Sequence, residues 1–518
     1  MTYSFNLVDQ AWIPCIGVEG RICELSLRRT LAEAHEISGI AGSTPLETAA
    51  LYRLLLAVLH SALRGPESAA AWGALWRAGK WDEPWLHEYL DRWKYRFDLF
   101  DPQRPFYQSR DERVKTKSII NLAMDMASGN NAVLFDHHTE AGGAVISSSL
   151  AARLVITVQT FGLAGLCDPQ QKLFFTDAPW ARGIVFLVEG DNLFETLALN
   201  LLRYDVDNSR PLPGEIDDSP AWENEDLYQH DRIVPRGYLD YLTWQNRYIG
   251  LIPEGDTETP VVWAVSISPG LRLDPNTLDP MKHYRKDDKF GTLVLRFSED
   301  RALWRDSATL YQVHSPQNSR PPENFRETAD RFSGDRKHRE LRFIALGMAN
   351  DQAKIEFFRH EHFPLPLDYL EKDELVGQLS TALQWAEEAR RKLEYAAKWL
   401  AVLTISPKVD GKKWREIDKM SKEQAALLAN HWAVERFYWS ELDLSFLQLM
   451  GDLPRNADEA LVNWESVIQR TTWKALDGAA NLAGENPKAL KAAVRARAVL
   501  GGGLKELFPD QNNKESPA

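Results

Sequence analysis

The chain has 518 residues, of which 44% are hydrophobic and 26% are charged, so a fibrous or disordered protein is excluded and several domains are favoured. Its net charge of −13 argues against DNA binding over the whole surface, because phosphate neutralisation dominates such binding, but permits a local basic site. Three cysteines without a C-x-x-C pair exclude a disulfide framework and a thiolate zinc site, and they fit a reducing cytoplasm.

The first hundred residues predict a β-hairpin followed by helices. Apolar runs separated by glycines predict the hairpin near residues 5–25. Thr44, Pro45 and Glu47 have the pattern of an N-cap, a first-turn proline and a capping box, so a helix is expected to start there. A further helix is expected over about 83–95.

The segment Trp93–Gln108, WKYRFDLFDPQRPFYQ, is unusually rich in aromatic residues. It cannot continue as a helix past Asp101, because Pro102 and Pro105 each remove a backbone donor and fix φ. It is also too aromatic for a solvated loop. We therefore expect a buried, irregular connection after a helix.

The middle of the chain, about 99–367, predicts a mixed α/β body with long loops. Short β-rich runs at 184–188, 260–267 and 292–297 alternate with many glycines and prolines. The proline-rich stretch 314–325 is expected to be a loop.

The final third predicts helices only, each amphipathic and clearly delimited. Short connections favour an up-down four-helix bundle over residues 368–509, followed by a disordered tail at 510–518. The fold class is thus α+β, with a mixed body over 1–367 and a C-terminal bundle. The four expected helices run from Leu375 to Leu403, from Ser421 to Pro454, from Asn456 to Gly484, and from Asn486 with Pro487 to an end near Gly501–Phe508.

Two histidine motifs suggest metal chemistry only weakly. Asp136, His137 and His138 superficially match a phosphoesterase motif, but the further acidic motifs of such a site are missing. His360 and His362 have the wrong spacing for a helical zinc site, and an exposed loop is expected there. The sequence also contains no phosphate-binding loop and no G-x-S-x-G, so we expect neither a cofactor, a metal nor catalysis.

Two local patterns suit nucleic acid. The stretch 281–289, MKHYRKDDK, gathers Arg285, Lys286 and Lys289 between β-rich runs, where basic side chains could contact phosphates. Its two aspartates partly cancel this charge, so a solvated turn is an equal alternative. The stretch 347–353, GMANDQA, places amide side chains at a turn, and amides can read base edges, although such a turn is usually only a turn.

The GMANDQA string resembles the G-x-x-N-[ND]-Q-A segment of the CasA family, the large subunits of the type I-E CRISPR surveillance complex Cascade. The aromatic segment Trp93–Gln108 resembles that family's RFDLF…RPFYQ signature. Further similar stretches follow in the family's order at 5–15, 26–47 and 177–192.

The resemblance implies a non-catalytic subunit that recognises the protospacer-adjacent motif (PAM) in double-stranded DNA and starts strand separation. Gln352 is then similar to the family's glutamine wedge, with Asn350, Asp351 and Ala353 beside it. Lys286 or Lys289 resembles its lysine finger, which enters the minor groove, and Arg285 belongs to the same cluster. The sequence does not distinguish the two lysines.

The chain departs from the family at a glycine-rich loop, because the corresponding stretch 168–176 contains no glycine. Lys172 or Gln171 would substitute for it. A second loop would reach the crRNA 5′ handle through Leu134 or Phe135. The implied partners are double-stranded DNA, crRNA, the other Cascade subunits and a recruited helicase–nuclease. The implied location is the cytoplasm, and no membrane partner is expected. The alternative is a metal-dependent phosphoesterase or nuclease.

Overall fold

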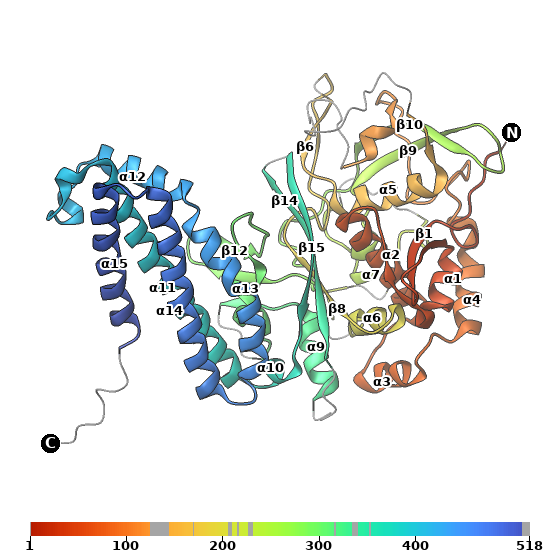
Figure 1. Ribbon diagram of the computed structural model, residues 1–518. Coiled ribbons are helices and arrows are strands. Elements are labelled where there is room, and N and C mark those ends of the chain that lie inside the picture. Colours follow the sequence, from red (N-terminus) through yellow and green to blue (C-terminus); the bar gives the residue numbers. More distant parts are fainter. Residues whose placement is uncertain are drawn as a thin grey trace. The chain divides into compact units, whose positions relative to one another are not determined.

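The computed structural model describes residues 2–124, 144–168, 170–205, 210–214, 217–225, 232–314, 318–333, 340–351 and 354–509. The chain forms two compact units (Figure 1). The N-terminal unit comprises Met1–Trp304 and Leu310–Glu371, and the C-terminal unit comprises Arg305–Thr309 and Lys372–Ala518.

Helix α2 (Pro45–Leu63) lies at the centre of the N-terminal unit. The side chain of Thr44 accepts a hydrogen bond from the Glu47 N–H at 3.1 Å, which confirms the predicted start. By length and hydropathy α2 could cross a membrane, but 89% of its apolar window is buried inside the protein, so it serves as a core helix. It packs against α5 (Ser148–Phe161) and α6 (Leu193–Asn200).

Several small sheets surround these helices, and the expected strands near 184–188, 260–267 and 292–297 are present as β8, β10 and β12. The sheet orders are β2-β1-β3, β4-β10-β5 with β9 on β10, β12-β11-β13, β15-β14-β8, and the hairpin β6-β7. The bounds are β1 (Ile13–Gly17), β2 (Ile22–Leu25), β3 (Ile37–Ile40), β4 (Lys117–Ser118), β5 (Ile146–Ser147), β6 (Gly165–Asp168), β7 (Leu173–Phe175), β8 (Val185–Glu189), β9 (Arg247–Glu254), β10 (Val261–Pro269), β11 (Tyr284–Asp287), β12 (Gly291–Val294), β13 (Ser319–Arg320), β14 (Arg342–Asp351) and β15 (Lys354–Pro364).

Shorter helices complete this unit. The stretch 314–325, expected to be a loop, instead includes strand β13 and the first residues of α9, because its prolines precede the helix rather than interrupt it. The remaining helices are α1 (Leu27–Ala32), α3 (Ala69–Ala78), α4 (Glu83–Trp93), α7 (Tyr238–Leu242), α9 (Glu323–Phe332) and α10 (Leu367–Glu371). Helix α8 (Ser307–Tyr311) is divided between the units, because its residues up to Thr309 belong to the C-terminal unit.

The aromatic segment after α4 is buried and irregular, as the sequence predicts. Phe97 and Leu99 are completely inaccessible to solvent. The Phe97 and Phe106 rings stack with their centroids 4.9 Å apart, and the Trp222 ring lies 5.1 Å from that of Phe97. The segment therefore contributes to the main core of the unit.

The C-terminal unit is helical and contains the expected long antiparallel helices: α11 (Asp373–Ile405), α13 (Val434–Asp452), α14 (Ala457–Ala483) and α15 (Pro487–Leu507) (Figure 1). The predicted single helix from Ser421 to Pro454 is wrong. It is divided into α12 (Lys419–His431) and α13 by Ala433, which adopts a left-handed φ of 50°. Helix α15 ends at Leu507, within the predicted range, and the run Gly501–Gly503 lies in its last turns, where a Cβ on Gly503 would come within 3.0 Å of Lys392.

The five-residue segment at Arg305 belongs to this helical unit through specific contacts. The Arg305 guanidinium lies 3.8 Å from the centroid of the Trp439 ring on α13. Its Nη2 lies 2.9 Å from Oε2 of Glu387 on α11. Arg305 thus links two helices of the bundle by a cation–π contact and an ion pair.

Candidate nucleic-acid interface

The stretch 281–289 combines an anchor with an exposed hairpin. Lys282 is buried, and its Nζ donates to the carbonyl oxygens of Pro179 at 2.9 Å and Arg182 at 2.7 Å. Burial lowers the pKa of Lys282 to about 8. Of the basic residues in this stretch, Lys282 therefore fixes the hairpin to the body, whereas Arg285, Lys286 and Lys289 are not buried.

The register of this hairpin distinguishes the two candidate lysines. Lys286 pairs with Thr292 inside the ladder, and Asp287 pairs with Gly291, so Lys289 lies at the tip. The Asp287 Oδ1 accepts hydrogen bonds from the N–H groups of Lys289 and Phe290, both at 2.9 Å. Gly291, the first residue of β12 after the three-residue turn 288–290, has a φ of 74°, a left-handed conformation that glycine adopts without strain. The tip is thus held by its own side-chain and backbone bonds.

The β14–β15 hairpin forms the second element. Leu346 pairs with Val185 of β8, and beyond this point β14 and β15 continue as a two-stranded arm. The register shifts between Ala349 and Asn350, and Asp351 is the last residue of β14, opposite Lys354. Asn350 and the backbone of Asp351 are therefore in the arm. Gln352 and Ala353 lie outside the described residues.

The β6–β7 hairpin forms the third element and contains most of the stretch 168–176, for which the sequence predicts a replacement of the family's glycine-rich loop. Lys172 itself adopts the left-handed conformation there, with a φ of 54°. Asp168 Oδ1 accepts from the N–H groups of Gln170 at 2.8 Å and Gln171 at 3.0 Å, and Gln171 Nε2 donates to the Arg113 carbonyl at 2.6 Å. Because Gln171 is engaged, Lys172 is the better candidate for contact with a partner.

The three hairpins share one base, the segment 176–185. The Ile184 N–H donates to the Leu295 carbonyl at the foot of the β11–β12 hairpin at 2.9 Å. Gly183 is packed so closely that an added Cβ would lie 2.3 Å from Cγ2 of Val294, so that side chain or the backbone would have to shift. Asp177 accepts from the Ala164 N–H beside β6 at 2.8 Å. In Figure 1 the β6–β7 hairpin and the free end of the β14–β15 arm extend toward the same side of the unit.

The histidine motifs do not form a metal site in the part of the chain that the structure describes. His360 and His362 lie in β15, not in a loop, because the whole segment pairs with β14. His362 Nδ1 and Arg342 Nε each lie 3.1 Å from the Glu189 carboxylate. Although burial raises the pKa of Glu189, the hydrogen bond from His362 and these positive charges lower it overall. Among the described residues, no three His, Cys, Asp or Glu side chains could hold a metal ion.

The residues 136–138 of the other motif, and the predicted crRNA contacts Leu134 and Phe135, lie outside the described residues.

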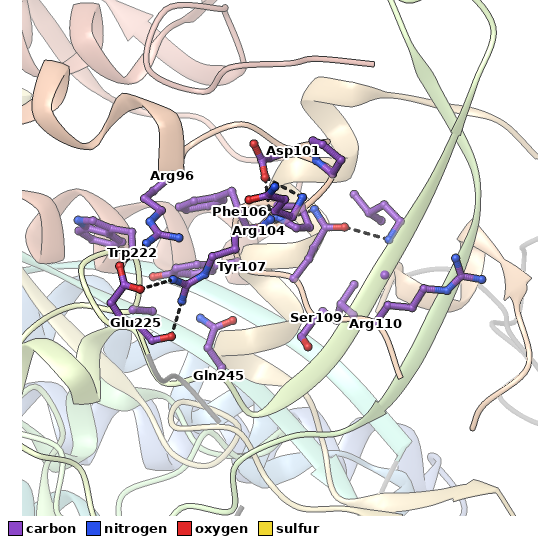
Figure 2. A pocket seen from close by; sticks show the side chains of 18 residues that line it. Arg96, Asp101, Arg104, Phe106, Tyr107, Ser109, Arg110, Trp222, Glu225 and Gln245 are labelled. Carbon is purple, nitrogen blue, oxygen red and sulfur yellow. Dashed lines mark hydrogen bonds and ion pairs between the residues drawn. The ribbon is translucent and has the colours of Figure 1, made fainter. Parts of the chain in front are cut away.

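A cavity of about 480 Å³ borders the aromatic segment (Figure 2). The Arg96 Nη2 lies 2.9 Å from Oε1 of Glu225, and the Arg104 Nη2 donates to the Asn224 and Glu225 carbonyls at 2.9 Å and 2.8 Å. Tyr107 adopts a left-handed φ of 55°, and burial raises the pKa of its hydroxyl. These contacts pair Arg96 and Arg104 with groups of the protein itself, so much of the positive charge that lines the cavity already has a partner. This network was not predictable from the sequence, because Glu225 is distant in the chain from Arg96 and Arg104.

The family model for the CRISPR-associated protein Cse1 matches residues 6–475. The chain belongs to the Cse1 (CasA) family. It is 32% identical to the CRISPR-associated protein CasA/Cse1 of Thermus thermophilus over 97% of this chain and 98% of that protein. The crystal structure of CasA from Thermus thermophilus is similar with a TM-score of 0.81 and 30% identity, over 97% of this chain and 99% of that one.

A second solved structure, a CRISPR RNA-guided surveillance complex, contains a chain with the same fold. Its TM-score is 0.75 at 21% identity, over 96% of this chain and 100% of that chain. The fold that this chain shares with the two solved structures therefore extends over nearly its whole length, including the helical bundle.

Proposed function

We propose that this chain is the non-catalytic large subunit of an RNA-guided DNA surveillance complex in the cytoplasm, and that its three hairpins recognise the PAM in double-stranded DNA. Membership of the Cse1 family supports the subunit role. The surveillance complex among the similar structures agrees with partners that include crRNA and other Cascade subunits. Sequence readout would then come from base pairing to the guide.

The observation that carries the DNA-binding proposal is the position of Lys289 at the tip of an anchored, exposed hairpin. A lysine on a narrow tip can reach a groove that a flat surface cannot enter. Lys172 and Asn350 are on hairpins whose bases contact the same segment, 176–185, which supports a shared role with Lys289. With a net charge of −13, DNA contact confined to these tips is the electrostatically reasonable arrangement.

Strand separation is assigned to Gln352, flanked by Asp351 and Ala353, as the wedge beneath the PAM. Unstacking a base step costs on the order of a few kcal/mol, which heteroduplex formation offsets. Leu134 or Phe135 would contact the crRNA 5′ handle. A helicase–nuclease would be recruited once the R-loop has formed.

The test is R-loop formation by the reconstituted complex on PAM-bearing and PAM-scrambled duplexes at fixed salt. We expect Gln352→Ala to abolish most PAM-dependent opening while the complex still assembles. Gln424→Ala, at an exposed glutamine of α12, is the matched control. PAM-dependent opening that is equal in the two variants would refute the wedge assignment.

A further inference from the structure

Phe290, next to Lys289, is an exposed aromatic residue at the tip of the β11–β12 hairpin. Its side chain is 67% exposed, although the other aromatic residue of the hairpin, Tyr284, is buried at the foot. The Asp287 carboxylate bonds to the N–H groups of both tip residues at 2.9 Å. The ring is thus presented to solvent on a backbone that is already ordered.

The ring and the neighbouring cation form one unit. Lys289 Nζ lies 5.1 Å from the centroid of the Phe290 ring, within the range of a cation–π contact. Such a contact holds a positive charge beside an apolar surface. This combination suits the minor groove, where the charge meets phosphates and the apolar group can enter between base pairs.

Charge alone gives this hairpin little affinity for DNA. Its three solvent-accessible cations, Arg285, Lys286 and Lys289, are opposed by the carboxylates of Asp287 and Asp288, which leaves a net charge of +1. Electrostatic attraction scales with the number of phosphates neutralised, and three cations beside two carboxylates can neutralise only about three of them. A second, non-ionic contribution to the binding free energy is therefore needed for this tip to bind a duplex tightly.

We propose that Phe290 is an apolar wedge that enters the minor groove beside Lys289 and partly unstacks one base step. This inference rests on the proposed DNA-recognition function and adds a residue to it. Partial insertion of phenylalanine is a known way of kinking a duplex toward the major groove. The kink would weaken the base pairs at the position where strand separation begins.

The experiment measures the rate of R-loop formation by the reconstituted complex carrying Phe290→Ala, Phe290→Leu or wild-type chain. Three duplexes are used: one intact with a PAM, one intact with a scrambled PAM, and one with a PAM and a pre-opened bubble beside it. We expect Phe290→Ala to slow opening of the intact PAM duplex roughly tenfold, which is the scale of removing one buried aromatic contact. Phe290→Leu should restore part of the rate, and the bubble should restore nearly all of it.

The control is Trp263→Ala, which removes another exposed aromatic side chain, 44% exposed on β10. Equal rates for Phe290→Ala and Trp263→Ala on the intact PAM duplex, with wild type still dependent on the PAM, would overturn the wedge role of Phe290. A wild-type complex that opens PAM and scrambled duplexes equally would instead overturn the proposed function. A slow rate that the bubble does not restore would identify Phe290 as a simple affinity contact and also overturn the wedge.

A photo-crosslinking amino acid at position 290 provides an independent measurement. Substituting Phe290→p-benzoylphenylalanine should give crosslinks to nucleotides at the PAM and its first neighbouring step. Crosslinks only to distant phosphates or to protein would contradict insertion.

Discussion

Substitution of the buried lysine beneath the β11–β12 hairpin has a calculable effect on stability. Lys282 has a folded-state pKa of about 8, below its usual 10.5, because burial disfavours its charge. The difference of about 2.5, at 1.36 kcal/mol per pKa unit, corresponds to about 3 kcal/mol of unfavourable free energy when both states are protonated. Because the unfolded state binds more protons between pH 8 and 10.5, stability should rise with pH across that range.

Lys282→Met keeps most of the aliphatic stem but removes the ammonium group. Removing the buried charge should stabilise the folded state by about 3 kcal/mol. The substitution also removes two hydrogen bonds and leaves the Pro179 and Arg182 carbonyls unsatisfied, which costs about 1–3 kcal/mol for each carbonyl. At pH 7 the two effects should nearly cancel or leave the variant less stable by up to about 3 kcal/mol. Lys282→Ala also loses the buried stem and should be about 3 kcal/mol less stable than Lys282→Met.

The assay is urea denaturation of the full chain and of both variants at several pH values from 7.5 to 10.5. Comparison with Lys282→Met cancels the titration of groups that the two proteins share. The free energy of unfolding of the wild type, relative to this variant, should rise by about 3 kcal/mol over that pH range. Parallel curves for the two proteins would refute the assignment of Lys282 as a buried, partly discharged anchor.

Three further substitutions test other features. Lys289→Ala should weaken DNA binding by the complex and reduce the slope of log K against log salt by about one. Lys80→Ala, which removes an exposed lysine outside the hairpins, should leave both unchanged. Equal slopes for the two variants would argue against a phosphate contact of Lys289. Ala433→Gly should raise the unfolding free energy by roughly 1 kcal/mol, because glycine relieves the left-handed φ of 50°, and a lower melting temperature would contradict this. Arg305→Ala should lower the melting temperature of the helical unit through a loss of roughly 1–3 kcal/mol, and an unchanged transition would show that its contacts contribute little.

Features with a local cause were predictable from the sequence. The start of α2 depends on Thr44 and Pro45, and the starts of α14 and α15 depend on Asn456 and Asn486, whose side chains accept from nearby N–H groups. The division between α12 and α13 was missed because Ala433 is an ordinary helix former, and no glycine or proline marks its left-handed backbone.

Features that depend on distant partners were not predictable. His360 is in a strand rather than a loop because it pairs with Leu346 across the β14–β15 ladder. The positions of Lys286 in the ladder and Lys289 at the tip follow from the cross-strand register, which no short sequence window contains. The assignment of Gln352 as a wedge stays a prediction. The same holds for every other proposed contact with DNA or crRNA, namely those of Asn350, Asp351, Ala353, Lys172, Arg285, Lys286, Lys289, Leu134 and Phe135.

The contribution of Arg305 to the helical unit has a consequence for synthesis on the ribosome. Its partner Glu387 is translated roughly 80 residues later and Trp439 roughly 130 residues later, which at 5–20 residues per second is a delay of about 4–26 seconds. The helices must therefore assemble around a segment that was synthesised well before them, within the sequence of the other unit. A chain truncated to begin at Lys372 would lack this segment, and Glu387 and Trp439 would lose their Arg305 contacts.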